Sequence, residues 1–213
     1  DVDVVAGVRS AAAARRRLPP GVDTLVCDLT DDDAVAALTH ALAVRRVTDV
    51  ICTIGFFPTF VPEEDRRLAE AVDYEATVRL IRAAAAAGLP GRFVLVSSLG
   101  IDLTTPSARL LDASLGGVLR QKAKAEAALR GTAGLDWAIV RPGLLDVTRP
   151  AGGVLLGPAG RWTGDAARDA VGPGGPVACA TPFVASSGAV CAATRRQVAE
   201  VCVAAVREGG FSR

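Results

Sequence analysis

Two positions in the middle of the chain have residue types suited to chemistry. Ser97 and Ser98 follow the apolar run 93–96, and Lys122 lies in the segment 116–143, which reads GGVLRQKAKAEAALRGTAGLDWAIVRPG. A serine hydroxyl at a strand end can hydrogen-bond a substrate carbonyl, or it can satisfy backbone groups of its own turn. A lysine ammonium can donate hydrogen bonds to ligand hydroxyls. The pattern therefore predicts either a small-molecule site or a polar strand end beside a surface helix.

The segment 116–143 predicts a helix followed by a buried strand. A helix that begins near Gly117 places Val118, Lys122 and Glu126 on one face, because positions four apart share a face. The run 135–140 is apolar and rich in strand-forming residues, and a proline ends it. A lysine is unusual on such a face, which singles out Lys122. The alternative is an ordinary amphipathic helix with solvated lysines.

The rest of the chain alternates predicted strands and helices. Strands are expected at 4–8, 22–27, 48–54 and 93–98, and helices at 11–17, 34–43, 66–87 and after 194. This alternation predicts a parallel, doubly wound α/β sheet with right-handed crossovers. Two helix starts have the spacing of a capping box, Thr30 with Asp33 and Thr194 with Gln197.

This arrangement resembles the short-chain dehydrogenase/reductase superfamily. In that superfamily a helix with Tyr-x-x-x-Lys precedes a strand that ends in Arg-Pro-Gly, and Lys122 matches the lysine. Val118 stands at the tyrosine position, which resembles the atypical branch that includes NmrA-like proteins and plastid and bacterial NADP-binding proteins. The resemblance implies one Rossmann-like domain over residues 1–213, with a Gly/Pro-rich region at 151–188 on the substrate side.

The resemblance also implies which residues form the site. Arg9 would bind the adenosine 2′-phosphate, which favours NADP over NAD. Lys122 would bind the nicotinamide ribose, and Ser98 would orient a substrate carbonyl. Tyr74, in a stretch at 72–77 that resembles the opening of a long helix, is the less favoured candidate for a substitute acid. The remaining residues implied in cofactor binding are Asp28, Leu29, Thr53, Ile54, Gly55, Ser97, Pro142, Gly143 and Leu144.

Without the tyrosine, two functions stay open. Ser98 and Lys122 favour an NADPH-dependent oxidoreductase that acts on a small organic substrate. Val118 favours a non-enzymatic NADP(H)-binding sensor or scaffold of the NmrA-like type. A structural module without a ligand is the default for the chain in isolation.

The first βα unit of such a domain is not recognisable. Sheets of this kind hold the dinucleotide diphosphate at a Gly-rich turn, and no G-x-G-x-x-G or G-x-x-G-x-x-G occurs in the chain. The first 30 residues match the second and third strands of the resembling domains better than the first. We therefore expect an unfilled sheet position between the strands at 4–8 and 48–54, and weak or no NADP binding by this chain.

Composition argues against several kinds of partner and site. The chain has 24 basic and 23 acidic residues, so it lacks the charge that nucleic acid or an anionic membrane would attract. No apolar run approaches the roughly 20 residues of a membrane span. Its five cysteines have no Cys-x-x-Cys spacing, which predicts reduced thiols and an intracellular location, in the cytoplasm or plastid stroma. Because the chain has a single histidine, we do not expect a zinc site.

Overall fold

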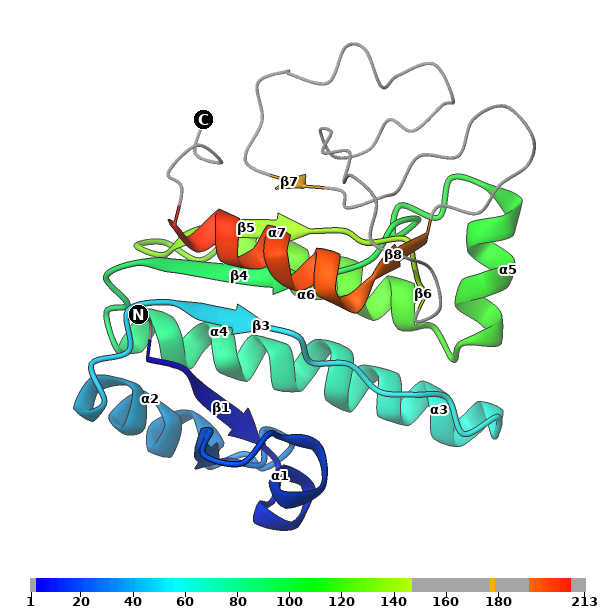
Figure 1. Cartoon of the computed structure of the whole chain (residues 1–213). Coiled ribbons are helices and arrows are strands. Elements are labelled where there is room, and N and C mark those ends of the chain that lie inside the picture. The colour runs from blue at the N-terminus through cyan, green and yellow to red at the C-terminus, as the bar shows by residue number, and fades with distance from the viewer. Residues whose placement is uncertain (1–2, 147–176, 179–191, 208–213) are drawn as a thin grey trace.

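The computed structural model describes residues 3–146, 177–178 and 192–207, and its elements alternate as the sequence predicts (Figure 1). The strands are β1 (Val5–Val8), β2 (Asp23–Val26), β3 (Val50–Cys52), β4 (Arg92–Val96), β5 (Asp136–Val140), β6 (Leu144–Asp146), β7 (Val177–Ala178) and β8 (Ala192–Thr194). The helices are α1 (Ala11–Arg17), α2 (Ala34–Val44), α3 (Pro62–Leu68), the π-helix η1 (Ala69–Ala76), α4 (Thr77–Ala86), α5 (Pro106–Ser114), α6 (Val118–Arg130) and α7 (Arg195–Arg207).

In the described residues the strands form three parallel sheets. The central sheet has the order β3-β4-β5-β7, β1 pairs with β2, and β6 pairs with β8. Within the described residues β1 and β3 share no ladder, and Figure 1 shows β1 set apart from β3. The predicted doubly wound α/β class is confirmed, and the sheet is open where an unfilled position was expected.

Alternate residues of the central strands pack against opposite helical layers. Phe93, Leu95 and Ile139 belong to a core with α2, α4 and α6, whereas Val94 and Val140 pack against α7. Figure 1 shows α7 lying across its face of the sheet. Side chains alternate along a strand, so a strand buried on both faces must be apolar throughout. The predicted docking of the last helix on the sheet is confirmed.

A long helical segment, α3–η1–α4, follows β3. It begins at Pro62 rather than near residue 66, because proline suits the first helical turn and the buried Asp65 carboxylate accepts backbone N–H groups of Thr59 and Phe60 at 2.7 and 3.1 Å. The stretch 72–77 lies within this segment rather than at its opening, so that expectation was wrong. Gly88, at φ +63°, follows its end as predicted.

Of the two expected capping boxes, the second forms. Gln197 N donates to Thr194 Oγ1 at 3.1 Å, and Thr194 N donates to Gln197 Oε1 at 2.9 Å. At the first, the Thr30 hydroxyl donates to Asp28 Oδ1 at 2.6 Å, and Asp33 makes no side-chain cap. The first expectation was therefore wrong, because a nearby carboxylate competes for the threonine.

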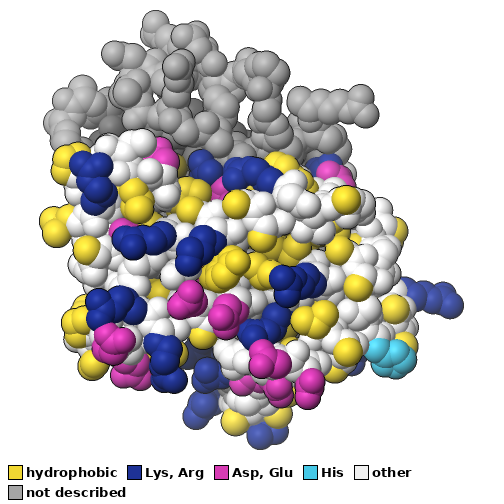
Figure 2. Space-filling view, turned by 180° about the vertical axis from the view of Figure 1, so that it is seen from behind, with side chains coloured by type: hydrophobic (Ala, Val, Ile, Leu, Met, Phe, Trp, Pro, Cys, Tyr) yellow, Lys and Arg dark blue, Asp and Glu magenta, His cyan; other side chains and the backbone are white. Residues whose placement is uncertain are grey.

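Several sequence expectations concern the rest of the chain. Apart from β7, the region 151–188 lies outside the described residues. Cys27, Cys52 and Cys202 are free thiols, and Cys179 and Cys191 are not described. In the part of the chain that the structure describes, no helix is long and apolar enough to cross a membrane. On the face shown in Figure 2, basic and acidic side chains are interspersed.

Candidate functional site

Lys122 lies where the carboxyl end of β3 meets α6 and η1. Its Nζ is 2.9 Å from Asp73 Oδ1 and donates to the carbonyl oxygen of Ile54 at 3.4 Å. The Lys122 side chain is 17% exposed, and that of Asp73 is 1% exposed. The buried Asp73 carboxylate therefore balances the charge of the Lys122 ammonium, and solvent still reaches that ammonium.

The π-helix η1 brings Asp73 to this position. A π turn is rare, and it recurs at functional sites because it re-aims side chains within a helix. Asp73 Oδ2 also accepts the N–H of Phe56 at 3.3 Å, so one carboxylate joins η1, α6 and the loop after β3. The sequence prediction did not identify Asp73 as a site residue. The available signal was an acidic residue between the buried Ala69 and Ala76 on one helix face.

Gly55 leaves this ion pair open on one side. A Cβ added at Gly55 would lie 3.4 Å from Asp73 Oδ1 and 3.7 Å from Lys122 Nζ, so any longer side chain would fill the space beside the pair. Of its neighbours, Thr53 is exposed and Ile54 packs against the core. A glycine at this strand end allows a ligand to approach the backbone closely, and the arrangement fits a cofactor ribose that lies against Lys122.

The helix α5 fixes the N-terminus of α6. Asp112 of α5 is 1% exposed, and its Oδ1 accepts Arg120 N at 3.1 Å while its Oδ2 accepts the Arg120 guanidinium at 2.9 Å. A carboxylate there satisfies an open N–H group and complements the helix dipole. Val118, one residue after the helix N-cap, is buried and carries no hydroxyl. The sequence prediction included neither α5 nor this contact.

The two serines after β4 have different surroundings. Ser97 is buried, and the nearby Glu126 carboxylate binds Arg141 through contacts of 2.8 and 2.6 Å. Burial alone would raise the pKa of Glu126, but the hydrogen bonds and charge of Arg141, with the charge of Arg130, hold that pKa below its ordinary value. Ser98 is half-buried, and its hydroxyl donates to the carbonyl of Leu99 at 3.1 Å. Ser98 is thus the more accessible of the two, and both predicted roles stay predictions.

Arg9 and Asp28 follow the neighbouring strands β1 and β2, and both are exposed. Hydrogen bonds from the Thr30 hydroxyl and backbone lower the pKa of Asp28 most, and the charge of Arg9 lowers it further. Leu29 packs against the core, and its carbonyl accepts Arg79 at 3.2 Å. The structure therefore groups Arg9 with Asp28 at one sheet end, separately from the Lys122 pair after β3.

The remaining predicted residues follow β5. Pro142 is buried, its carbonyl accepts Leu99 N at 2.9 Å, and Gly143 is half-buried. Leu144 begins β6, and its side chain lies outside the description.

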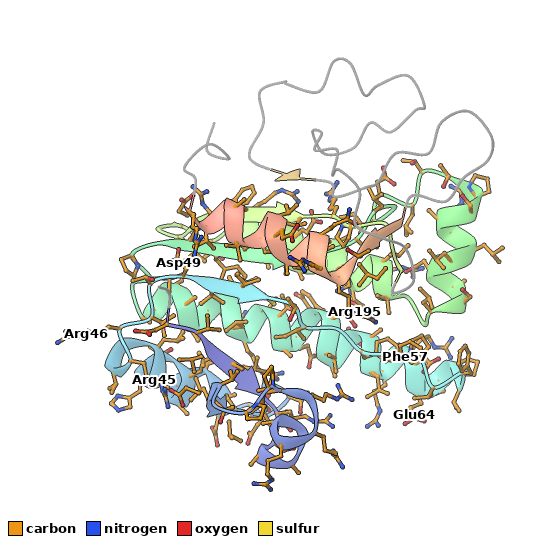
Figure 3. The ribbon with its side chains drawn as sticks, in the orientation of Figure 1. Arg45, Arg46, Asp49, Phe57, Glu64 and Arg195 are labelled. Atoms are coloured by element: carbon orange, nitrogen blue, oxygen red, sulfur yellow. The ribbon has the colours of Figure 1, made fainter. Side chains whose placement is uncertain are left out.

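Tyr74 pairs with a different lysine of α6. Its ring faces Lys124, whose Nζ lies 5.3 Å from the ring centroid. This contact opposes a role as substitute acid. Figure 3 shows where the exposed Phe57 lies, on the loop that leads away from the pair to α3.

Comparison with known families identifies the class of ligand. A family model described as NAD(P)H-binding matches residues 1–172. The chain belongs to this NAD(P)H-binding family. The match confirms the NAD(P)-binding domain that the resemblance implied. Among curated proteins, none has a matching sequence.

Solved structures share the fold of this NAD(P)H-binding protein. A Bacillus halodurans protein assigned as an NAD-dependent epimerase/dehydratase is 22% identical with a TM-score of 0.62, over 98% of this chain and 78% of that one. The Lactococcus lactis oxidoreductase ylbE is 18% identical with a TM-score of 0.55, over 82% and 68%. The Bordetella bronchiseptica enzyme WbmG, solved with NAD, is 18% identical with a TM-score of 0.52, over 71% of this chain and 48% of that one. At these identities the likeness shows the fold alone.

Proposed function

We propose that the protein binds NADP(H) and acts as an NADPH-dependent oxidoreductase on a small organic substrate. The observation that carries the proposal is the Lys122–Asp73 pair, which lies at the carboxyl end of β3 and is left open by Gly55. In open α/β sheets, ligands bind at the carboxyl ends of strands, where the strand order reverses. In the described residues β1-β2 and β3-β4-β5-β7 are separate sheets, and the reversal would lie between them.

The described residues fit two parts of a dinucleotide. Lys122 would donate hydrogen bonds to the nicotinamide ribose, and Arg9 would bind the adenosine 2′-phosphate as a planar, permanently charged donor. Asp28 and Leu29 would contact the adenine. The diphosphate is not assigned to any residue, because the sequence has no Gly-rich turn. Residues that would line the cofactor channel are Thr53, Ile54, Gly55, Ser97, Pro142, Gly143 and Leu144.

The proposed reaction divides its tasks between two side chains. When bound, the dinucleotide supplies a hydride. Ser98 would hydrogen-bond the substrate carbonyl, and Lys122 would orient the ribose. Val118 has no acidic hydrogen, so the proton for the reduced oxygen would come from water or from the substrate.

A second candidate function is an NADP(H) sensor or scaffold without catalysis. The buried Val118 favours the sensor or scaffold, because a valine cannot act as the general acid that carbonyl reduction needs. Turnover of a small carbonyl substrate in the presence of NADPH separates the two functions.

We also propose an intracellular location, supported by the free thiols of Cys27, Cys52 and Cys202.

The test of cofactor choice is a titration of the chain with NADP(H) and NAD(H) to millimolar concentration, followed by NMR because weak binding is expected. Arg9→Ala should weaken NADP(H) binding by roughly 10- to 100-fold, the worth of a charge-assisted hydrogen bond, and leave NAD(H) nearly unchanged. Arg82→Ala, which removes an exposed arginine of α4, is the matched control and should change neither. Equal affinities of the parent for NADP and NAD would contradict the NADP preference. Failure to bind either dinucleotide at millimolar concentration would contradict the binding proposed here, and would agree instead with the expectation of no binding drawn from the missing Gly-rich turn.

A further inference from the structure

Lys122 and Asp73 form a charge-balanced pair whose members are enclosed to different extents. Asp73 is the more deeply buried, and its second oxygen is occupied by Phe56 N. The titratable neighbour of the pair on β3 is Cys52. Desolvation raises the pKa of that buried thiol, so Cys52 is uncharged at neutral pH. The two opposite charges of the pair therefore set the local field.

A fixed charge at this place would distinguish the two oxidation states of a nicotinamide. The oxidised ring carries a positive charge, and the reduced ring is neutral. An uncompensated lysine beside the ribose would repel the oxidised ring and leave the reduced ring unaffected. An uncompensated carboxylate would attract the oxidised ring.

We propose that Asp73 is a specificity-determining residue that sets the preference of the site between NADP⁺ and NADPH. This inference rests on the proposed function, which places the nicotinamide ribose at Lys122. With the pair intact, the fixed charge is zero and the two oxidation states bind with similar affinity. The π-helix η1 serves this role because it places a carboxylate 2.9 Å from the lysine and holds it there.

A second pair between the same two helices provides a matched control. Lys124 Nζ lies 3.9 Å from Glu70 Oε1, and the two side chains are 46% and 54% exposed. Like the Lys122–Asp73 pair, it joins α6 to η1. Water and salt screen charges at such exposure, so a change of charge there should not reach the site.

The experiment measures dissociation constants for NADP⁺ and for NADPH in four proteins: the parent, Asp73→Asn, Lys122→Gln and the double variant. Asparagine keeps the shape and an acceptor for Phe56 N while it removes the charge. For unit charges on the order of 10 Å apart at an effective dielectric constant of about 20, the expected effect is roughly tenfold. The ratio of the NADP⁺ to the NADPH dissociation constant should rise about tenfold in Asp73→Asn and fall about tenfold in Lys122→Gln. It should return to the parent value in the double variant.

The controls Glu70→Gln and Lys124→Gln carry the same charge changes and should leave the ratio within about twofold, since exposed pairs contribute little. A purely structural role for Asp73 would lower both affinities together with an unchanged ratio, and that result would overturn the inference. If Asp73→Asn does not fold, the parent and Lys122→Gln decide together, because a compensating Asp73 gives a ratio near one in the parent and well below one in Lys122→Gln. If the parent binds neither oxidation state, the proposed function fails and the inference fails with it.

Discussion

Two ion-pair clusters lie one turn apart on α6, and their surroundings differ. Glu126 is fully buried and binds Arg141, which is 12% exposed, and Arg130, which is 38% exposed. Lys122 has one carboxylate partner and remains open beside Gly55. The Glu126 cluster joins α6 to Arg141, at the end of β5, through a fully buried carboxylate. The Lys122 pair keeps a donor available to a ligand. The comparison separates a role in stability from a role in binding on one helix face.

Breaking the enclosed cluster should have the largest effect. Glu126→Ala removes a fully buried carboxylate that binds Arg141, and removing one partner of a buried pair costs about 3–5 kcal/mol of the free energy of unfolding. Urea unfolding followed by circular dichroism measures this loss. Glu200→Ala removes the partner of Arg196 in an exposed pair of α7 and should cost less than about 1 kcal/mol. Equal losses in the two variants would mean that Glu126 has no special structural role.

Restoring a hydroxyl beside the open pair tests its chemistry. Val118→Tyr supplies a proton donor one turn before Lys122, and a positioned general acid typically contributes 10²–10⁴-fold to a rate. We expect NADPH-dependent reduction of a carbonyl substrate to rise by about 10²-fold, the lower end of that range. Val118→Phe has similar bulk without the hydroxyl and should give no gain. An unchanged rate in Val118→Tyr with the cofactor still bound would favour the sensor function.

The sequence predicted this helix face because its signals are local. Lys122 and Glu126 follow from helical spacing, and both lie where that spacing puts them. Thr194 and Gln197 formed their capping box, in which Gln197 N donates to Thr194 Oγ1 and Thr194 N donates to Gln197 Oε1. Thr30 had Asp28 two residues away, and that short Asx-type contact formed instead.

The partners of this helix face were harder to predict. Asp73 is distant from Lys122 in the sequence, and it reaches the lysine only through the packing of η1 against α6 and through a π turn that no local pattern marks. The helix α5 did have a local signal. Thr105 accepts Ala108 N at 3.1 Å, and Pro106 occupies the first turn, so the cap and the proline could have predicted a helix at 106–114.

The smallest expected effect is on the pH dependence of the free energy of unfolding, to which the Glu126 cluster should contribute. The pKa of Glu126 lies below its ordinary value of 4.5 in the folded protein, whereas the unfolded chain titrates near the ordinary value. Between these values the unfolded chain binds the proton more readily, so the stabilisation is present above the ordinary pKa and is lost as the pH falls through the folded value. From about pH 5 to about pH 3, the free energy of unfolding should therefore fall more steeply in the parent than in Glu126→Gln, which does not titrate. Urea unfolding at intervals over this range gives both slopes.

The other carboxylates with lowered pKa values, such as Asp28 and Asp65, titrate in both proteins and cancel in the difference. Glu200→Gln, which neutralises the carboxylate of an exposed pair with Arg196, is the control variant. Identical slopes in the parent and Glu126→Gln would show that Glu126 gains nothing from Arg141 on folding, and the distinction between the two clusters would then be one of geometry alone.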